Sequence, residues 1–249
     1  MTAVDPGAIA DIGSDQADLA PSTAQYARRF EGPTGSWLLS RQTEALRRLI
    51  APWPGASVLD VGGGHGQVAA PLVADGHPVQ VHATSAQALG RAADMPGVVT
   101  GTGPLMPLPH ADGAFDIVTS FRILAHIGDW PAYLAELTRV ARRAVIVDFA
   151  IPGGVNALEP LLFGVKKKIE GDTRRYAAIP RREICARLAE LGFADQQTVG
   201  QFVLPMVLHR KLKQPGLSSA LEGSLRAIRL DRLVGTPVVL CAARSPSHT

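Results

Sequence analysis

Cysteine is almost absent from this sequence of 249 residues, which contains only Cys185 and Cys241. The two lie far apart and lack the close spacing of zinc-binding cysteines. A disulfide framework and a cysteine-based metal centre are therefore excluded, and the sequence is typical of a reducing cytoplasm. Aromatic residues are also scarce, at 5%, whereas the 46% of hydrophobic residues is ordinary for a globular protein.

Long hydrophobic runs are missing as well. No segment approaches ~20 uninterrupted apolar residues, so we expect no transmembrane helix. The N-terminal segment has no basic cluster followed by an apolar stretch, so it does not resemble a secretory signal. It carries four aspartates instead: Asp5, Asp11, Asp15 and Asp18. Because it also lacks periodicity, residues 1–20 are expected to form a flexible tail of a soluble, cytoplasmic protein.

Positive charge is concentrated in one part of the chain. Residues 1–150 contain 10 Lys and Arg against 14 Asp and Glu, whereas residues 151–249 contain 15 against 8. A basic half can face an anionic substrate, a membrane surface or nucleic acid, and it can equally be a solvated helical surface. Charge alone does not choose among these alternatives.

Apolar strands alternate with helical segments through the middle of the chain. The expected strands are 56–61, 79–83, 98–101, 115–121 and 144–149, and the expected helices between them are 65–75, 85–94 and 130–140. This alternation indicates a doubly wound α/β fold, in which helices cover both faces of a parallel sheet. The carboxyl ends of its strands meet at one edge, where such folds bind ligands.

Less regular segments flank this central part. Helices are expected at 22–30, 36–50, 155–169, 181–192 and 217–233, and strands at 194–204 and 238–243. Pro237 at the start of the last strand favours an antiparallel or edge position. The apolar run 202–208 is either an internal strand or a surface for a hydrophobic acceptor.

The run from Val58 to Gln67, Val-Leu-Asp-Val-Gly-Gly-Gly-His-Gly-Gln, is the most informative stretch. It predicts a buried strand followed at once by a glycine-rich turn and a helix. Glycines allow a tight turn and let a ligand approach the backbone closely. Their spacing is one residue tighter than the G-x-G-x-x-G of dinucleotide-binding proteins, which argues against a nucleotide-dependent oxidoreductase. A turn without any ligand is the remaining alternative.

The D-x-G-x-G-x-G order of this turn resembles the first motif of the class I S-adenosylmethionine-dependent methyltransferases. Residues 107–121 resemble a second motif of that family, an L-P-x-x-D-x-x-F-D-x-V loop and strand, and residues 121–140 resemble its continuation. The resemblance covers residues 56–150. It implies a mostly parallel, seven-stranded Rossmann-like sheet with an antiparallel final strand, and S-adenosylmethionine as the cofactor.

The resemblance also implies which residues hold the cofactor. In the family, the glycine turn passes beneath the amino-acid moiety, and the acid at the strand end helps to orient the loop and the charged amine. The predicted cofactor-binding residues are Asp60, Gly62, Gly63, Gly64, His65, Gly66, Thr84, Ser85, Thr102, Gly103, Phe121 and Arg122. Arg122 can receive a carboxylate of the cofactor or of an acidic substrate, or it can pair with a surface acid.

Two departures from the family pattern concern the nucleoside. The family usually has an acid at the end of the second strand, which accepts both ribose hydroxyls, but here that region reads His82-Ala83-Thr84-Ser85. It also tends to have an aspartate for the adenine amine, where this sequence has Thr102. The hydroxyls of Thr84, Ser85 and Thr102 are the expected substitutes, although they bind more weakly than an ionised carboxylate.

These features predict a single methyltransferase domain over residues 21–249. Helices at 21–51 resemble the lid that small-molecule methyltransferases lay over the cofactor, with Tyr26 and Phe30 either in that lid or simply packed. Insertions at 151–178 and 200–235 are expected to select the acceptor. His65 and His126 are near the expected site, but no general base is assigned.

The expected function is methyl transfer to a small, partly apolar metabolite. The alternatives are a non-catalytic cofactor-binding accessory protein and an RNA methyltransferase. The basic second half prompts the RNA alternative, and the lack of an N-P-P-Y-like motif or an RNA-binding module argues against it. No metal is expected, and acceptor and oligomeric state stay open.

Overall fold

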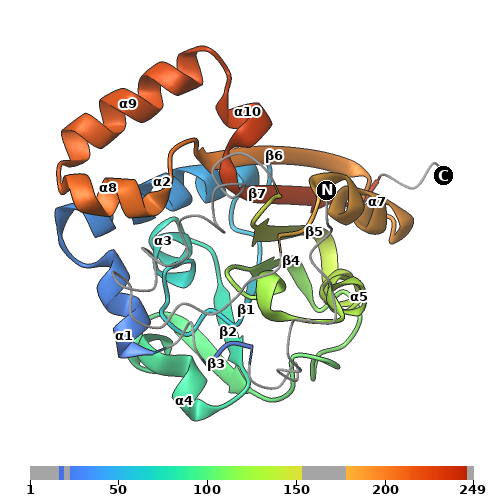
Figure 1. The fold of residues 1–249 in the computed structure, drawn as a ribbon. Helices are drawn as coiled ribbons and strands as arrows, with labels where there is room; N and C mark the ends of the chain where they lie inside the picture. The colour runs from blue at the N-terminus through green and yellow to red at the C-terminus, as the bar shows by residue number, and fades with distance from the viewer. Residues whose placement is uncertain (1–16, 20–22, 153–177, 246–249) are drawn as a thin grey trace.

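The computed structural model describes residues 17–19, 23–152 and 178–245. Its centre is a seven-stranded sheet in the order β3-β2-β1-β4-β5-β7-β6 (Figure 1). The strands are β1 (Val58–Val61), β2 (Val79–Ala83), β3 (Val98–Thr102), β4 (Phe115–Ser120), β5 (Ala141–Phe149), β6 (Asp195–Phe202) and β7 (Thr236–Ala243). β7 pairs antiparallel with β5 and β6, and the other pairs are parallel. The predicted fold class is confirmed.

Helices surround this sheet in the described part of the chain. The α-helices are α1 (Ala24–Ala27), α2 (Gly32–Ile50), α3 (Ala69–Ala74), α4 (Ala86–Leu89), α5 (Trp130–Val140), α7 (Arg181–Glu190), α8 (Met206–Leu212), α9 (Pro215–Ala227) and α10 (Asp231–Val234). Short 3-10 helices span Arg28–Phe30, Gly90–Asp94 and Leu124–His126. Side chains cap two of these helices, because Ser85 accepts a hydrogen bond from the Ala88 N–H and Asp129 accepts one from the Ala132 N–H.

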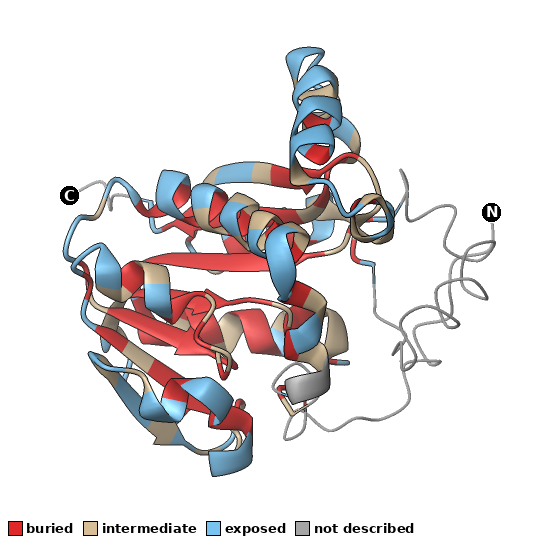
Figure 2. Cartoon of the chain, turned by 90° about the vertical axis from the view of Figure 1, so that its left-hand side faces the viewer, coloured by how far each residue is buried: buried red, intermediate tan, exposed pale blue. Residues whose placement is uncertain are grey.

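Alternate strand residues pack in two hydrophobic cores, one on each face of the sheet. Leu59 and Val61 of β1 belong to the core that includes α5 and α7. Val58 belongs to the core on the other face, with α2, α3 and α4. All four residues of β1 are buried, as Figure 2 shows for the centre of the sheet. This burial on both faces holds the carboxyl end of β1 in place.

The glycine-rich turn is longer than predicted. The helix expected from residue 65 begins only at Ala69. Gly62 and Gly66 have φ angles of +78° and +66°, in the left-handed region that favours glycine. The Gly66 N–H donates to the Gly63 carbonyl at 2.8 Å, which closes a turn instead of starting a helix. The turn therefore spans residues 62–68 at the end of β1.

Other element boundaries also differ from the predictions. β5 begins at residue 141 instead of 144. The helix predicted at 217–233 is divided into α9 and α10, where Arg229 has a φ of +60°. The predicted helix 155–169 lies outside the described residues.

Residues 206–234, comprising α8, α9 and α10, form an arm beside α2 (Figure 1). The segment 206–208, which the sequence left open as a strand, is the first turn of α8. The indole N–H of Trp37 in α2 donates to the Ser219 hydroxyl at 2.7 Å. The centroids of the Trp37 and His209 rings are 4.9 Å apart. The arm and α2 are thus joined by a small aromatic cluster that also contains Phe30 and Phe202.

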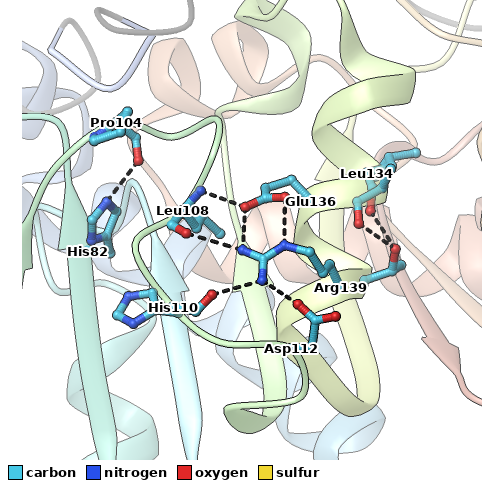
Figure 3. Close-up of polar contacts among 10 residues, drawn as sticks. His82, Pro104, Leu108, His110, Asp112, Leu134, Glu136 and Arg139 are labelled. Carbon is cyan, nitrogen blue, oxygen red and sulfur yellow. Dashed lines mark hydrogen bonds and ion pairs between the residues drawn. The ribbon is translucent and has the colours of Figure 1, made fainter.

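Arg139 of α5 fixes the loop between β3 and β4 (Figure 3). Its guanidinium donates to Glu136 at 2.7 Å, to Asp112 at 2.6 Å and to the carbonyls of Leu108 and His110. The hydrogen bond from Arg139, opposed by partial burial, holds the pKa of Glu136 below its usual range. One planar guanidinium therefore ties three residues of the loop, Leu108, His110 and Asp112, to α5.

We expect Arg139→Lys to destabilise the protein by about 1–2 kcal/mol, because a single ammonium cannot bond both carboxylates and both carbonyls. Thermal unfolding measures this, with Arg142→Lys as the control, since Arg142 is a largely exposed arginine with one ion pair in the described region. Equal melting temperatures for the two variants would contradict this role for Arg139.

Candidate active site

A small cavity lies at the carboxyl end of β1. It is lined by Gln42, Asp60, Gly62, Gly63, His65, Gln67, Val68, Phe121 and Arg122. Six of these residues are predicted site residues, and they come from β1, from the glycine turn and from the end of β4. Gln42 of α2, with Gln67 and Val68 of the turn, was not predicted. Nothing in the sequence indicated that α2 reaches this edge of the sheet.

Asp60 is fully buried beside this cavity. The Thr119 hydroxyl of β4 donates to one of its oxygens, Oδ1, at 2.8 Å. The other oxygen, Oδ2, is buried and has no hydrogen-bond partner among the residues that the structure describes. Burial raises the pKa of the Asp60 carboxyl to about 7, although the Thr119 hydrogen bond and the Arg122 charge oppose the rise. A buried acceptor without a donor is costly unless a ligand supplies one.

Packing within the turn explains why it contains so many glycines. A Cβ on Gly63 would lie 1.8 Å from Asp60 Oδ2, and one on Gly62 would lie 2.6 Å from the Ile123 side chain. A Cβ on Gly66 would meet the Met95 side chain at 2.1 Å. The Gly64 carbonyl accepts the Ala92 N–H, which ties the turn to the 3-10 helix after α4. Gly63 thus lies directly against the Asp60 carboxylate, and its neighbours are packed too closely for side chains.

Arg122 brings a positive charge to the same cavity. Its backbone has a φ of +64°, and its N–H donates to Asp148 Oδ1 at 2.5 Å. Burial raises the pKa of Asp148 to about 6 in spite of this bond. The guanidinium donates to the side-chain oxygens of Gln67 and Gln42. Of the alternatives for Arg122, pairing with a surface acid is not observed among the described residues.

Aromatic residues of the N-terminal helices cover the turn. The rings of Tyr26 and His65 are stacked, with 6.3 Å between centroids and 6° between planes. The Arg122 guanidinium lies 4.4 Å from the centre of the Phe30 ring. Tyr26 and Phe30, singled out from the sequence as candidates for a lid, thus contact two cavity residues.

The predicted residues at the ends of β2 and β3 do not line the cavity. The Thr84 hydroxyl donates to the Asp18 carboxylate, and the Ser85 hydroxyl caps α4. Thr102 is exposed at the end of β3, and the Gly103 N–H donates to the Ala83 carbonyl. The hydroxyls of Thr84 and Ser85 already have partners within the protein.

Asp18, the partner of Thr84, was not singled out from the sequence, because it lies within the predicted tail, residues 1–20. In the structure Ala17 and Asp18 are fully buried. Only 17–19 of that range are described, so the tail prediction is not tested for the rest. No signal in the sequence placed Asp18 at the end of β2.

Neither a metal site nor a general base emerges from the geometry. No group of three or more potential metal ligands occurs in the described segments 17–19, 23–152 and 178–245. His126, the other histidine considered from the sequence, ends a 3-10 helix and is half-buried. The carboxyl group of Asp60 and the guanidinium of Arg122 line the same small cavity. Together they can bind the ammonium and the carboxylate of a zwitterionic amino acid.

Comparison with known protein families finds a match in the central part of the chain. A family model described as a methyltransferase domain matches residues 59–147, which include the glycine turn and β4. Residues 59–147 thus match a methyltransferase domain, in agreement with the family that the motifs of the sequence resemble.

One curated methyltransferase is similar in sequence. The demethylmenaquinone methyltransferase of Beutenbergia cavernae is 32% identical over 152 residues, which are 57% of this chain and 62% of that protein. The matching region thus spans less than two thirds of the length of this relative.

Solved methyltransferase structures share the fold. The magnesium protoporphyrin IX methyltransferase of Synechocystis PCC 6803 with bound SAH has a TM-score of 0.62 at 17% identity and covers 94% of this chain and 100% of its own. A possible histamine N-methyltransferase of Thermotoga maritima has a TM-score of 0.58 at 14% identity and covers 93% and 99%. At these identities the likeness concerns the methyltransferase fold.

Within the described segments, no helix of the protein is both long enough and apolar enough to cross a bilayer.

Proposed function

We propose that this protein transfers the methyl group of S-adenosylmethionine to a small, partly apolar acceptor. The observation that carries the proposal is the buried, unpartnered Oδ2 of Asp60, on a cavity that also receives the Arg122 guanidinium. The donor's ammonium would pair with Asp60, and its carboxylate with Arg122. The bound donor supplies an electrophilic methyl group, and the protein's part is to position donor and acceptor.

Two parts of the structure near the proposed reaction can be given roles, namely the N-terminal helices and the arm. Helix α1 and the 3-10 helix Arg28–Phe30 would form the lid with α2, because Tyr26 and Phe30 already lie on His65 and Arg122 and Gln42 of α2 lines the cavity. The arm would face the acceptor. Of the six exposed large hydrophobic residues in the described chain, five belong to the arm: Leu208, Leu217, Leu221, Ile228 and Leu233. They favour an acceptor with apolar surface.

The names of similar proteins support the same acceptor class. The curated relative is named for demethylmenaquinone, and one structural neighbour for magnesium protoporphyrin IX. Both names describe small molecules with large apolar parts. The cytoplasm is the proposed location, in keeping with two free cysteines.

Two assays test the proposal. Calorimetric titration should give heat with S-adenosylmethionine and none with NAD. Incubation with a labelled methyl donor and a cell extract should then give a labelled, solvent-extractable product and S-adenosylhomocysteine. Binding without transfer to any fraction of the extract would favour the accessory protein, and heat with NAD alone would favour an oxidoreductase.

Donor binding should also depend on pH. Because burial raises the pKa of Asp60 to about 7, the carboxyl is mostly protonated at pH 6 and cannot attract an ammonium. The ionised fraction rises about fivefold from pH 6 to pH 7, and the association constant should rise by about the same factor. Titration at the two pH values measures this, and a flat profile would contradict the pairing with Asp60.

A further inference from the structure

Asp18 places a carboxylate at the carboxyl end of β2. One of its oxygens, Oδ2, accepts the backbone N–H of Thr84 at 2.7 Å, and the other, Oδ1, accepts the Thr84 hydroxyl at 2.5 Å. Thr84 directly follows β2 (Val79–Ala83), and Asp18 lies 66 residues before it in the chain. An acidic side chain thus reaches a strand end whose own sequence contains none.

The same carboxylate lies beside the glycine turn. The Cβ of Asp18 is 3.5 Å from the position that a Cβ on Gly62 would occupy, and Gly62 lines the cavity. The pKa of Tyr133 is raised chiefly by burial, and the charges of Asp18 and Asp60 both add to the rise. Asp18 and Asp60 therefore approach one edge of the sheet, from the ends of β2 and β1.

Asp18 has acceptor capacity left. Each carboxylate oxygen can accept two hydrogen bonds, and Thr84 supplies only one to each. No arginine, lysine or histidine pairs with Asp18 among the described residues, although Asp18 is fully buried. A buried carboxylate without a counter-ion is costly, and hydroxyl donors of a ligand would reduce that cost.

We propose that Asp18 accepts the ribose hydroxyls of the methyl donor, in place of an acid at the end of β2. In doubly wound folds that bind nucleotides, an acid near that strand end bonds the ribose hydroxyl. Here the N-terminal segment delivers the carboxylate, and Thr84 orients it. This inference rests on the proposed function, because it requires that the donor's amino-acid end lies at Asp60.

A ligand-based double-mutant cycle tests this assignment. Affinities of the wild type and of Asp18→Asn are measured for S-adenosylhomocysteine and for its 2′,3′-dideoxy analogue. A charge-assisted hydrogen bond predicts that the wild type prefers the natural ligand by about 10- to 100-fold. In Asp18→Asn this preference should fall to about threefold or less.

The controls separate ribose binding from anchoring. If Asp18 only anchors the N-terminal segment, Asp18→Asn weakens both ligands equally and the preference stays at the wild-type value, which would overturn the proposal. Thr84→Val should weaken both ligands without abolishing the preference. Asp195→Asn changes an exposed acid on β6 and should bind both ligands as the wild type does. If the wild type binds neither ligand, the proposed function itself fails, an outcome distinct from binding without discrimination.

Discussion

The variant Asp60→Asn should lose about 100-fold in affinity for S-adenosylmethionine and yet be more stable than the wild type. The affinity falls because the buried carboxylate is the proposed partner of the donor's ammonium, and breaking such a pair removes several kcal/mol. The stability rises because Asp60 is fully buried with a pKa raised to about 7. Keeping its charge in the folded protein at pH 8 therefore costs free energy.

The gain in stability should have a defined sign and pH window. The pKa of Asp60 is higher in the folded state than the ordinary 3.8, so the carboxyl destabilises the fold increasingly as the pH rises from about 4 to about 7. At pH 8 we expect Asp60→Asn to be about 1–2 kcal/mol more stable, after allowing for an unpartnered amide NH2 group. At pH 5 the advantage should be absent. Thermal unfolding at both pH values measures it.

Asp116 provides the matched control on the neighbouring strand β4. Burial alone would raise its pKa, but hydrogen bonds from Ser57 and the charges of Arg143 and Arg142 hold the pKa below its usual value. Asp116→Asn should therefore lower stability at neutral pH and leave donor affinity unchanged. Lower stability of Asp60→Asn at pH 8, or full donor affinity, would contradict the role assigned to Asp60.

The second large effect is expected in the arm. Glu222 of α9 is 2% exposed and accepts the N–H groups of Val203 and Leu204, and its Oε1 lies 3.0 Å from Nε2 of the buried His209. Glu222→Ala would remove the acceptor of the Val203 and Leu204 N–H groups and the partner of the buried His209 ring, and should cost about 3–5 kcal/mol. Hydrogen exchange of the amides in α8 and α9 should accelerate accordingly, because this junction holds the arm to the end of β6.

Glu190→Ala is the control, because Glu190 is an exposed glutamate that pairs only with Arg187 among the described residues. Its exchange pattern should match that of the wild type. Burial would raise the pKa of Glu222, but the bonds from His209, Val203 and Leu204 outweigh it and lower the pKa. The stabilisation is thus present above the ordinary 4.5 and is lost as the pH falls through the lower folded value. If the amides of α8 and α9 exchange at the wild-type rate in Glu222→Ala, the contacts of Glu222 do not hold the arm to the end of β6.

The central fold could be predicted because local patterns and tertiary structure agree there. The alternation of apolar strands and helices predicted the sheet, and caps such as Ser85 and Asp129 fixed helix starts. The glycine turn was located correctly, but its length was not. Two left-handed glycines delay the helix to Ala69, which a pattern of apolar residues does not reveal.

Residues far apart in the sequence could not be placed in the same way. Gln42 and Asp18 come from segments that precede the sheet, and only tertiary packing brings them to its edge. Residues 217–233 of the arm were predicted as one helix, but Arg229 breaks it, and no glycine or proline marks that position. By residue type, Thr84 and Ser85 were suitable to bind the ribose. In the structure the Thr84 hydroxyl donates to Asp18, and the Ser85 hydroxyl caps α4.

A crystal structure of the protein with S-adenosylhomocysteine tests the central claim most directly. We predict that the ligand's ammonium lies within hydrogen-bond distance of Asp60 Oδ2 and that its carboxylate contacts Arg122. A ligand bound elsewhere, or a cavity that stays filled by Arg122, Gln42 and Gln67 at saturating ligand, would contradict the proposed function and leave only the fold.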